Sequence, residues 1–134
     1  MSGEVIVSAA VVLDESGRAL VVRKHGSAVF QQPGGKPDAG ETPLEAVVRE
    51  VAEETGIVAD PASFEPLGRF TDAAANEPGH LVVADAYVLR VAVDAASVVP
   101  AAEIAELRWL TEADVEATPL APLSRNHLIR FAWR

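Results

Sequence analysis

Residues 35–57, GKPDAGETPLEAVVREVAEETGI, carry the pattern that decides the fold, because they contain the clearest helix in the chain. The pattern predicts a helix over residues 43–55 with Thr42 as its N-cap. Glu45 stands three residues after the cap and completes a capping box, and Gly56 is placed to end the helix. One side of this helix is apolar at helical spacing and consists of Leu44, Val47, Val48 and Val51.

A second side of the same helix is acidic. Each residue turns a helix by about 100°, so Glu50, Glu53 and Glu54 lie within about 100° of arc. Like charges at this spacing repel by a few tenths of a kcal/mol per pair, so a functional arrangement implies a ligand. Divalent cations such as Mg²⁺ prefer carboxylate oxygens and often bind substrate phosphates as well. The acidic side therefore indicates metal-assisted attack of water on phosphorus, although such a side alone is more often a solvated surface.

The spacing of residues around the helix argues against a solvated surface. Residues 35–57 contain a glycine, five residues, a glutamate, seven residues, Arg-Glu, an aliphatic residue, any residue, Glu-Glu, any residue, a glycine and an aliphatic residue. A chance match has a probability on the order of one in 10⁸ or less per starting position. The pattern is that of the Nudix box, and the chain therefore resembles the Nudix hydrolase family. The matching residues are Gly35, Glu41, Arg49, Glu50, Val51, Glu53, Glu54, Gly56 and Ile57.

The resemblance implies an α/β fold, an α/β/α sandwich with a mixed central sheet in which the box forms a loop–helix–loop. It also implies hydrolysis, dependent on Mg²⁺ or Mn²⁺, of a nucleoside diphosphate linked to another group. Arg49 matches the arginine that orients a catalytic glutamate, and Glu41 matches the residue that pairs with it. Glu53 and Glu54 are expected to be catalytic. The positions that would hold metal are Gly34, through its backbone carbonyl, and Glu50, Glu53 and Glu54.

Residues outside the box are also candidates for the site. Many relatives supply a further carboxylate just before a late strand that contains tryptophan, and here Glu103 precedes Trp109. We expect Glu103 to be a fourth metal ligand or the general base, with Glu106 as the second candidate and a surface role as the alternative. Basic residues flanking the box loop could bind phosphate, and one asparagine stands where some mutator-type relatives read a purine edge. These substrate-binding candidates are Arg23, Lys36 and Asn126.

Extended segments flank the helix on both sides. Residues 4–13 and 18–24 are rich in aliphatic residues and are separated by a turn signal, which predicts a β-hairpin. No repeat or linker divides the chain, so residues 1–134 are predicted to form a single domain. Further strands are expected over residues 68–71, 81–93 and 106–110, a short helix after Thr111, and a C-terminal helix over residues 124–133.

The composition excludes several classes of protein. The chain has 134 residues with 20 acidic and 11 basic side chains, a net charge of −9, which argues against nucleic-acid polymers and anionic membranes as partners. The absence of cysteine excludes disulfides, thiolate zinc sites and cysteine nucleophiles. No signal peptide is evident, and no apolar run approaches the roughly 20 residues that span a bilayer. We therefore expect a cytoplasmic protein that binds a nucleotide, with a homodimer left open.

Markers of several Nudix subgroups are missing after the box. ADP-ribose hydrolases tend to carry a proline where this chain has residues 72–74, and dinucleoside polyphosphate hydrolases tend to carry a tyrosine there. Elimination leaves a nucleoside triphosphate, ordinary or damaged, cleaved to monophosphate and pyrophosphate. The alternatives are a non-catalytic nucleotide-binding sensor and a hydrolase of a sugar nucleotide such as ADP-ribose. An isomerase of the isopentenyl diphosphate type would need a cysteine, which the chain lacks.

Overall fold

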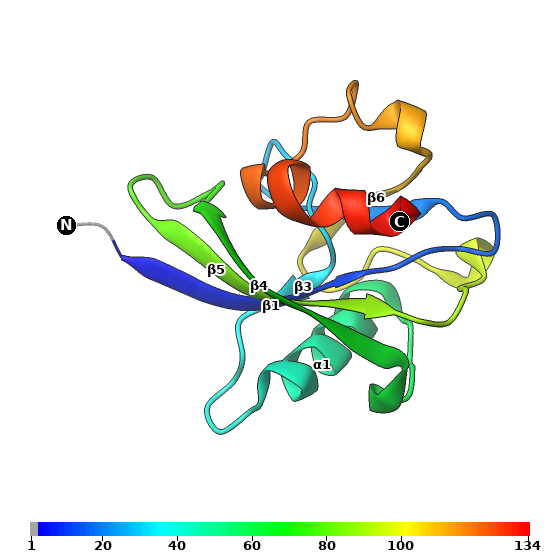
Figure 1. Ribbon diagram of the computed structural model, residues 1–134, viewed down its shortest axis with the longest axis horizontal. Helices are drawn as coiled ribbons and strands as arrows, with labels where there is room; N and C mark the ends of the chain where they lie inside the picture. Colours follow the sequence, from blue (N-terminus) through cyan, green and yellow to red (C-terminus); the bar gives the residue numbers. More distant parts are fainter. Residues whose placement is uncertain (1–2) are drawn as a thin grey trace.

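The computed structural model describes residues 3–134 and divides them among two sheets, one α-helix and several short helical turns (Figure 1). The four-stranded sheet has the order β3-β1-β5-β4, and the two-stranded sheet pairs β2 with β6. The strands are β1 (Glu4–Val11), β2 (Ala19–Lys24), β3 (Gly34–Gly35), β4 (Phe64–Ala73), β5 (Leu81–Leu89) and β6 (Ile104–Leu110). The helical elements are α1 (Pro43–Thr55), η1 (Pro61–Ser63), η2 (Ala95–Ser97), η3 (Glu112–Asp114), η4 (Ser124–Leu128) and η5 (Ile129–Trp133).

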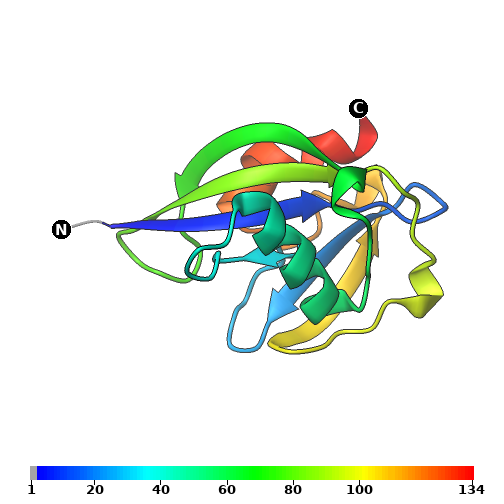
Figure 2. The same cartoon turned by 90° about the horizontal axis from the view of Figure 1, so that it is seen from below.

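The larger sheet is mixed, as expected. Strand β1 runs parallel to β5, with Glu4 opposite Leu81, whereas the β1–β3 and β4–β5 pairs are antiparallel. The helix α1 covers one face of the sheet and the C-terminal turns cover the other (Figure 1). Seen from the side of α1, the helix lies in front of β1, with β2 and β6 on one side and β5 and β4 on the other (Figure 2). The predicted three-layer α/β arrangement is confirmed.

Two apolar cores hold the layers together, because successive side chains of a strand point to opposite faces. In β1, Ala10 belongs to the core beneath α1, together with Val47 and Val51 of the helix. Its neighbours Ala9 and Val11 belong to the core beneath the C-terminal turns. Strand β2 divides its residues between the same two cores. The second half of β1 and most of β2 are buried on both faces, which explains their nearly continuous aliphatic sequences.

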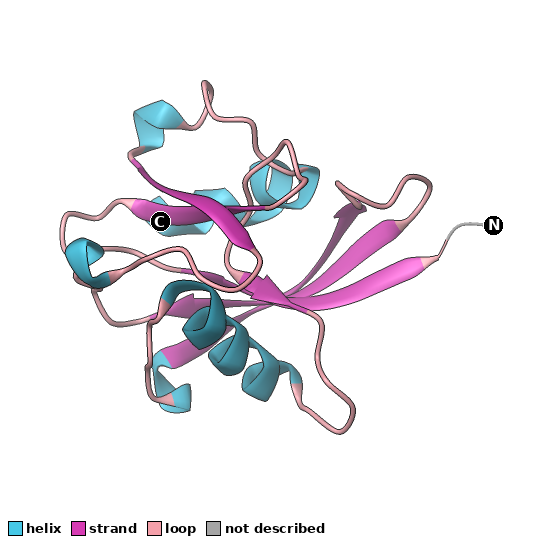
Figure 3. Ribbon diagram, turned by 180° about the vertical axis from the view of Figure 1, so that it is seen from behind, coloured by secondary structure: helices cyan, strands magenta, loops and turns pink. Residues whose placement is uncertain are grey.

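The prediction of a β-hairpin between residues 4–13 and 18–24 is wrong except at the turn. The turn itself forms, and the Asp14 carboxylate accepts the backbone N–H groups of Ser16 and Arg18 at 2.9 and 2.8 Å. After one bridge from Leu13 to Ala19, the strands separate into different sheets (Figure 3). Strand β1 instead lies between β3 and β5, and β2 pairs with β6, and in these positions both strands contribute side chains to the two apolar cores.

Residues 124–133 are helical, but they do not form the regular helix that the sequence predicts. Residues Ser124–Leu128 form a π-helical turn and Ile129–Trp133 a 3₁₀ turn. The core beneath these turns contains three of their side chains, Leu128, Ile129 and Ala132. The segment thus packs tightly although its hydrogen bonds are not those of an α-helix. Within residues 3–134, no helix is long and apolar enough to cross a membrane.

Candidate functional site

The helix α1 positions the acidic residues of the candidate site, and its ends are those predicted. Thr42 Oγ1 accepts the N–H of Glu45 at 3.1 Å, and the Glu45 carboxylate accepts the N–H of Thr42 at 2.9 Å, which closes the capping box. At the other end, Gly56 adopts a left-handed φ of 79° and its N–H donates to the carbonyl of Ala52. The caps fix where the helix begins and ends, and the packing of Val47 and Val51 in the core determines which side of it carries the glutamates.

Three carboxylates meet at one point between α1 and the strands. Glu50 and Glu54 of the helix and Glu103, just before β6, bring ligand oxygens within 4.8 Å of one another. Glu54 is 1% exposed, and its Oε1 accepts the N–H of Gly34 at 3.1 Å. Its Oε2 is buried and has no hydrogen-bond partner among residues 3–134. An unpaired buried carboxylate oxygen is costly, and it indicates a place for a cation.

The glycine pair of β3 allows this close approach. A Cβ on Gly35 would overlap the carboxylate of Glu50, and a Cβ on Gly34 would overlap the backbone carbonyl of Ser8 on β1. A side chain at Gly34 would therefore require β1 to move, and a side chain at Gly35 would displace the Glu50 carboxylate. The two glycines therefore allow the β3 backbone to lie directly against the carboxylates of Glu50 and Glu54.

Burial and mutual repulsion shift both helix carboxylates toward their protonated forms. Burial is the main cause that raises the pKa of Glu54 to about 8, and the charges of Glu50 and Glu103 act in the same direction. Burial also raises the pKa of Glu50 to about 7, with Glu53 and Glu103 adding to the shift. Positive charge from Arg49 or Lys24 opposes these shifts only in part. A bound cation would favour the ionised carboxylates, since an opposite charge stabilises them.

Arg49 binds two further glutamates of the box, Glu41 and Glu53, and its pairing with Glu41 agrees with the prediction. Its guanidinium donates to both oxygens of Glu41, at 2.8 and 2.9 Å, and to Oε1 of Glu53 at 2.9 Å. A further bond at 3.2 Å reaches the backbone carbonyl of Lys36. Hydrogen bonding from Arg49 lowers the pKa of Glu41 to about 2. The carboxylate of Glu53 is therefore held by Arg49 and stands apart from the group formed by Glu50, Glu54 and Glu103.

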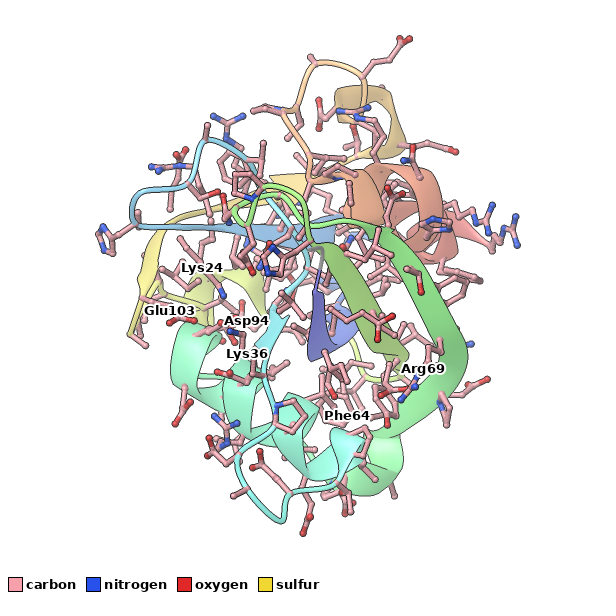
Figure 4. The ribbon with its side chains drawn as sticks, turned by 90° about the vertical axis from the view of Figure 1, so that its left-hand side faces the viewer. Lys24, Lys36, Phe64, Arg69, Asp94 and Glu103 are labelled. Carbon is pink, nitrogen blue, oxygen red and sulfur yellow. The ribbon has the colours of Figure 1, made fainter. Side chains whose placement is uncertain are left out.

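Lys24 lies beside the carboxylates and was not among the residues singled out from the sequence. Its Nζ is 3.4 Å from Oε1 of Glu103, and the two side chains point toward each other in Figure 4. The backbone also joins these segments, because the N–H of His25 donates to the carbonyl of Glu103 at 2.9 Å. The alternation of β2 could have revealed Lys24: Leu20 and Val22 face the core beneath α1, and Lys24 follows two residues later.

The other candidates from the sequence are not members of the three-carboxylate group. Arg23 donates to Glu106 at 3.4 Å and to the carbonyl of Ser27 at 3.1 Å, so Arg23 and Glu106 bind each other. Asn126 donates to Asp72 at 2.8 Å on the surface. Lys36 lines a hollow that also includes Lys24 and Gly35, and Figure 4 shows it on the same side of the molecule as Lys24 and Glu103.

A cavity adjoins the carboxylates on the opposite face of the sheet from α1. It measures about 490 Å³, including space open to solvent, and we call it the Gln32 cavity. Gly34, Gly35 and Lys24 form the end nearest the carboxylates, and Gln32 and Ser124 also line it. Apolar side chains supply much of the wall, including Val7, Ala9, Val82, Leu123 and Leu128.

Comparisons with known proteins agree with this geometry. The sequence matches the NUDIX domain family over residues 4–131. Phosphatase NudJ of Escherichia coli K12 is 45% identical over 60 residues, covering 43% of this chain and 39% of NudJ. The chain thus matches about two fifths of the length of that curated relative.

Two solved structures share the fold. The MutT protein of Methanosarcina mazei Go1 is 26% identical, with a TM-score of 0.77 over 97% of this chain and 94% of that chain. The NUDIX domain of Shewanella oneidensis NrtR, solved in complex with ADP ribose, is 19% identical, with a TM-score of 0.75 over 98% of this chain and 88% of that chain. Because the family match spans nearly all of the sequence, this chain belongs to the NUDIX domain family.

Proposed function

We propose that this protein is a divalent-metal-dependent hydrolase that cleaves a phosphoanhydride bond in a nucleoside diphosphate linked to another group. The favoured substrate is a nucleoside triphosphate, ordinary or damaged, which would give a monophosphate and pyrophosphate. The observation that carries the proposal is the meeting of Glu50, Glu54 and Glu103 beside the Gln32 cavity. A nucleotide whose base lies in that cavity would extend its phosphates toward the carboxylates.

The residues present fit Mg²⁺ or Mn²⁺. The donor set consists of carboxylate oxygens, which suit these hard cations, and Oε2 of Glu54 is buried and unpartnered within residues 3–134. Glu50, Glu54 and Glu103 would hold the ion. The resemblance adds Glu53 and the carbonyl of Gly34 to this set. When bound, the ion screens the phosphate charges and lowers the pKa of the attacking water.

The protein's own residues would orient the reaction and move its proton. Water oxygen attacks phosphorus, the bond from that phosphorus to the bridging oxygen breaks, and the leaving phosphate group takes the electron pair. The proton of the water passes to a carboxylate, for which Glu103 and the box glutamates are the candidates. Arg49 would keep Glu53 and Glu41 in place. Lys24 would contribute positive charge beside the phosphates.

A hydrolase of a sugar nucleotide is the second candidate. The observation in its favour is the ADP ribose bound by the NUDIX domain of NrtR, which shares the fold. A non-catalytic sensor is a weaker alternative, because all the box glutamates are retained in this chain. An isolated nucleotide-binding role would not need a three-carboxylate group with raised pKa values.

A substrate panel with Mg²⁺ tests the proposal. Nucleoside triphosphates, ADP ribose and other nucleoside diphosphate derivatives are incubated with the protein, and the products are separated and identified. Monophosphate and pyrophosphate from a triphosphate are expected, with activity lost in excess chelator. Terminal orthophosphate as the main product would contradict the bond assignment. Full activity in chelator would contradict the metal-dependent mechanism.

A further inference from the structure

Glu103 is held in the three-carboxylate group differently from its two partners. Glu50 and Glu54 belong to α1, and Glu54 is 1% exposed. The side chain of Glu103 is 53% exposed and belongs to the loop that leads into β6. Because half of this side chain faces solvent, its place in the group depends mainly on the course of the backbone that carries it.

The loop before β6 is bound to the last turn of α1. The final carbonyl groups of a helix have no partner within the helix itself. In this protein the N–H of Ala101 donates to the carbonyl of Glu54 at 3.0 Å, and the N–H of Val99 donates to the carbonyl of Thr55 at 3.4 Å. The loop is therefore joined to the backbone of one of the three carboxylate residues.

A tight turn follows these contacts, and its second residue has an unusual backbone conformation. The N–H of Ile104 donates to the carbonyl of Ala101 at 3.1 Å, which closes a turn over residues 101–104. Ala102 has a φ of 55° in this turn, the one positive φ of a non-glycine residue within residues 3–134. Turns with positive φ at the second position favour Gly, Asn or Asp. An alanine there costs free energy, because its Cβ crowds the following carbonyl oxygen.

The surrounding backbone, rather than a buried side chain, keeps Ala102 in this conformation. Its side chain is exposed, so burial of the methyl group offsets little of the cost. Before the turn, Ala101 is bound to α1; within it, the carbonyl of Glu103 accepts the N–H of His25 at 2.9 Å. Backbone strain of this kind persists where neighbouring structure imposes it, and it is common at functional sites. We infer that Ala102 is a positioning residue whose left-handed conformation directs Glu103 toward the two helix carboxylates.

This inference rests on the proposed function for the identity of the ion, so its first test measures metal binding without substrate. Binding of Mn²⁺ is followed by the electron paramagnetic resonance signal of the free ion. Valine is β-branched and strongly disfavours positive φ. We expect Ala102→Val to weaken Mn²⁺ binding by about tenfold, the lower end of the range for residues that orient metal ligands. Ala102→Gly should bind Mn²⁺ within about twofold of the wild type, because glycine adopts positive φ freely.

Thermal unfolding in chelator tests the backbone conformation independently of metal. Ala102→Gly should raise Tm by a few degrees, because the relief of strain exceeds the entropy that glycine adds to the unfolded chain. Ala102→Val should lower Tm. Ala117 is the matched control, since it is also exposed but does not have a positive φ. Ala117→Gly should lower Tm, and Ala117→Val should leave Mn²⁺ binding unchanged.

A double-mutant cycle separates a positioning role from a merely structural one. Glu103→Gln removes the carboxylate that Ala102 is inferred to place. Ala102→Val should therefore have little further effect on Mn²⁺ binding when Glu103→Gln is already present. Steady-state hydrolysis should show the same coupling, with kcat reduced in each single variant and no lower in the double variant.

The outcomes distinguish the inference from the proposed function. If a substrate is hydrolysed with metal but Ala102→Val binds Mn²⁺ as the wild type does, the inference is overturned and the hydrolase proposal stands. If the Mn²⁺ measurements agree with expectation but no substrate is hydrolysed, the inference stands and the hydrolase proposal falls. A lower Tm for Ala102→Gly than for the wild type overturns the inference, as does an equal loss of Mn²⁺ affinity with and without Glu103. Absence of Mn²⁺ binding by the wild type overturns both.

Discussion

Glu54 combines burial, a bond to the β3 backbone and a free oxygen, so its charge should be required for activity. We expect Glu54→Gln to reduce kcat by at least roughly 10²-fold, the scale for a positioned catalytic group, because an amide cannot replace a carboxylate as a cation ligand. The measurement is steady-state hydrolysis of the best substrate of the panel with Mg²⁺. Glu116→Gln, at an exposed position outside the site, should retain normal turnover. Retained activity in Glu54→Gln would remove this residue from the mechanism.

Arg49 acts through a planar fork that lysine cannot reproduce. In Arg49→Lys the paired bonds to Glu41 and the bond to Glu53 cannot all form. We expect the pKa of Glu41 to rise from about 2 toward its ordinary value, and kcat to fall because Glu53 loses its fixed position. Nuclear magnetic resonance titration of the Glu41 side chain checks the first effect independently of catalysis. An unchanged Glu41 titration would show that Arg49 does not hold it in solution.

At the scale of the element, α1 presents two carboxylates whose pKa values are raised to about 7 and about 8. Between the ordinary value of 4.5 and these folded values, the folded state binds more protons than the unfolded state. The free energy of unfolding of the metal-free protein should therefore fall as pH rises from about 5 to about 8. Denaturant unfolding in chelator across this range measures the slope. Glu54→Gln should flatten it, whereas Glu116→Gln should not.

Much of α1 could be predicted from the sequence because its signals are local. The capping box of Thr42 and Glu45, the C-cap Gly56 and the apolar spacing all act within one helix. The Arg49–Glu41 contact was also expected, from the family resemblance. The absence of Glu53 from the group of Glu50, Glu54 and Glu103 was not expected, because that group depends on contacts between distant segments. Gln32 and Ser124 line one cavity only through contacts between distant segments, which periodicity does not encode.

At the scale of the whole molecule, a cation should stabilise the fold. The folded protein assembles Glu50, Glu54 and Glu103 from two distant segments, whereas the unfolded chain separates them. Binding at a hundredfold excess over Kd would stabilise the protein by about 2.7 kcal/mol, a rise of several degrees in Tm. Thermal unfolding with MgCl₂, against NaCl at matched ionic strength, measures this effect.

Variants at the same carboxylates complete the thermal test. Glu50→Gln/Glu54→Gln should melt higher than the wild type in chelator, because the repulsion and the buried charge are removed. The same variant should lose most of its response to Mg²⁺. If it responds as the wild type does, the cation binds elsewhere.

The separation of β1 from β2 has a consequence for how the polypeptide folds during synthesis. Each strand finds its main partner far along the chain: β1 pairs with β5, with Glu4 opposite Leu81, and β2 pairs with β6, with Ala19 opposite Leu110. When the first two strands leave the ribosome, neither can complete its ladder, and their aliphatic side chains have no core to enter. Such nonlocal topology slows folding and leaves the nascent chain open to aggregation. The Asp14 turn can form early, but the sheets must wait until β5 and β6 have been translated.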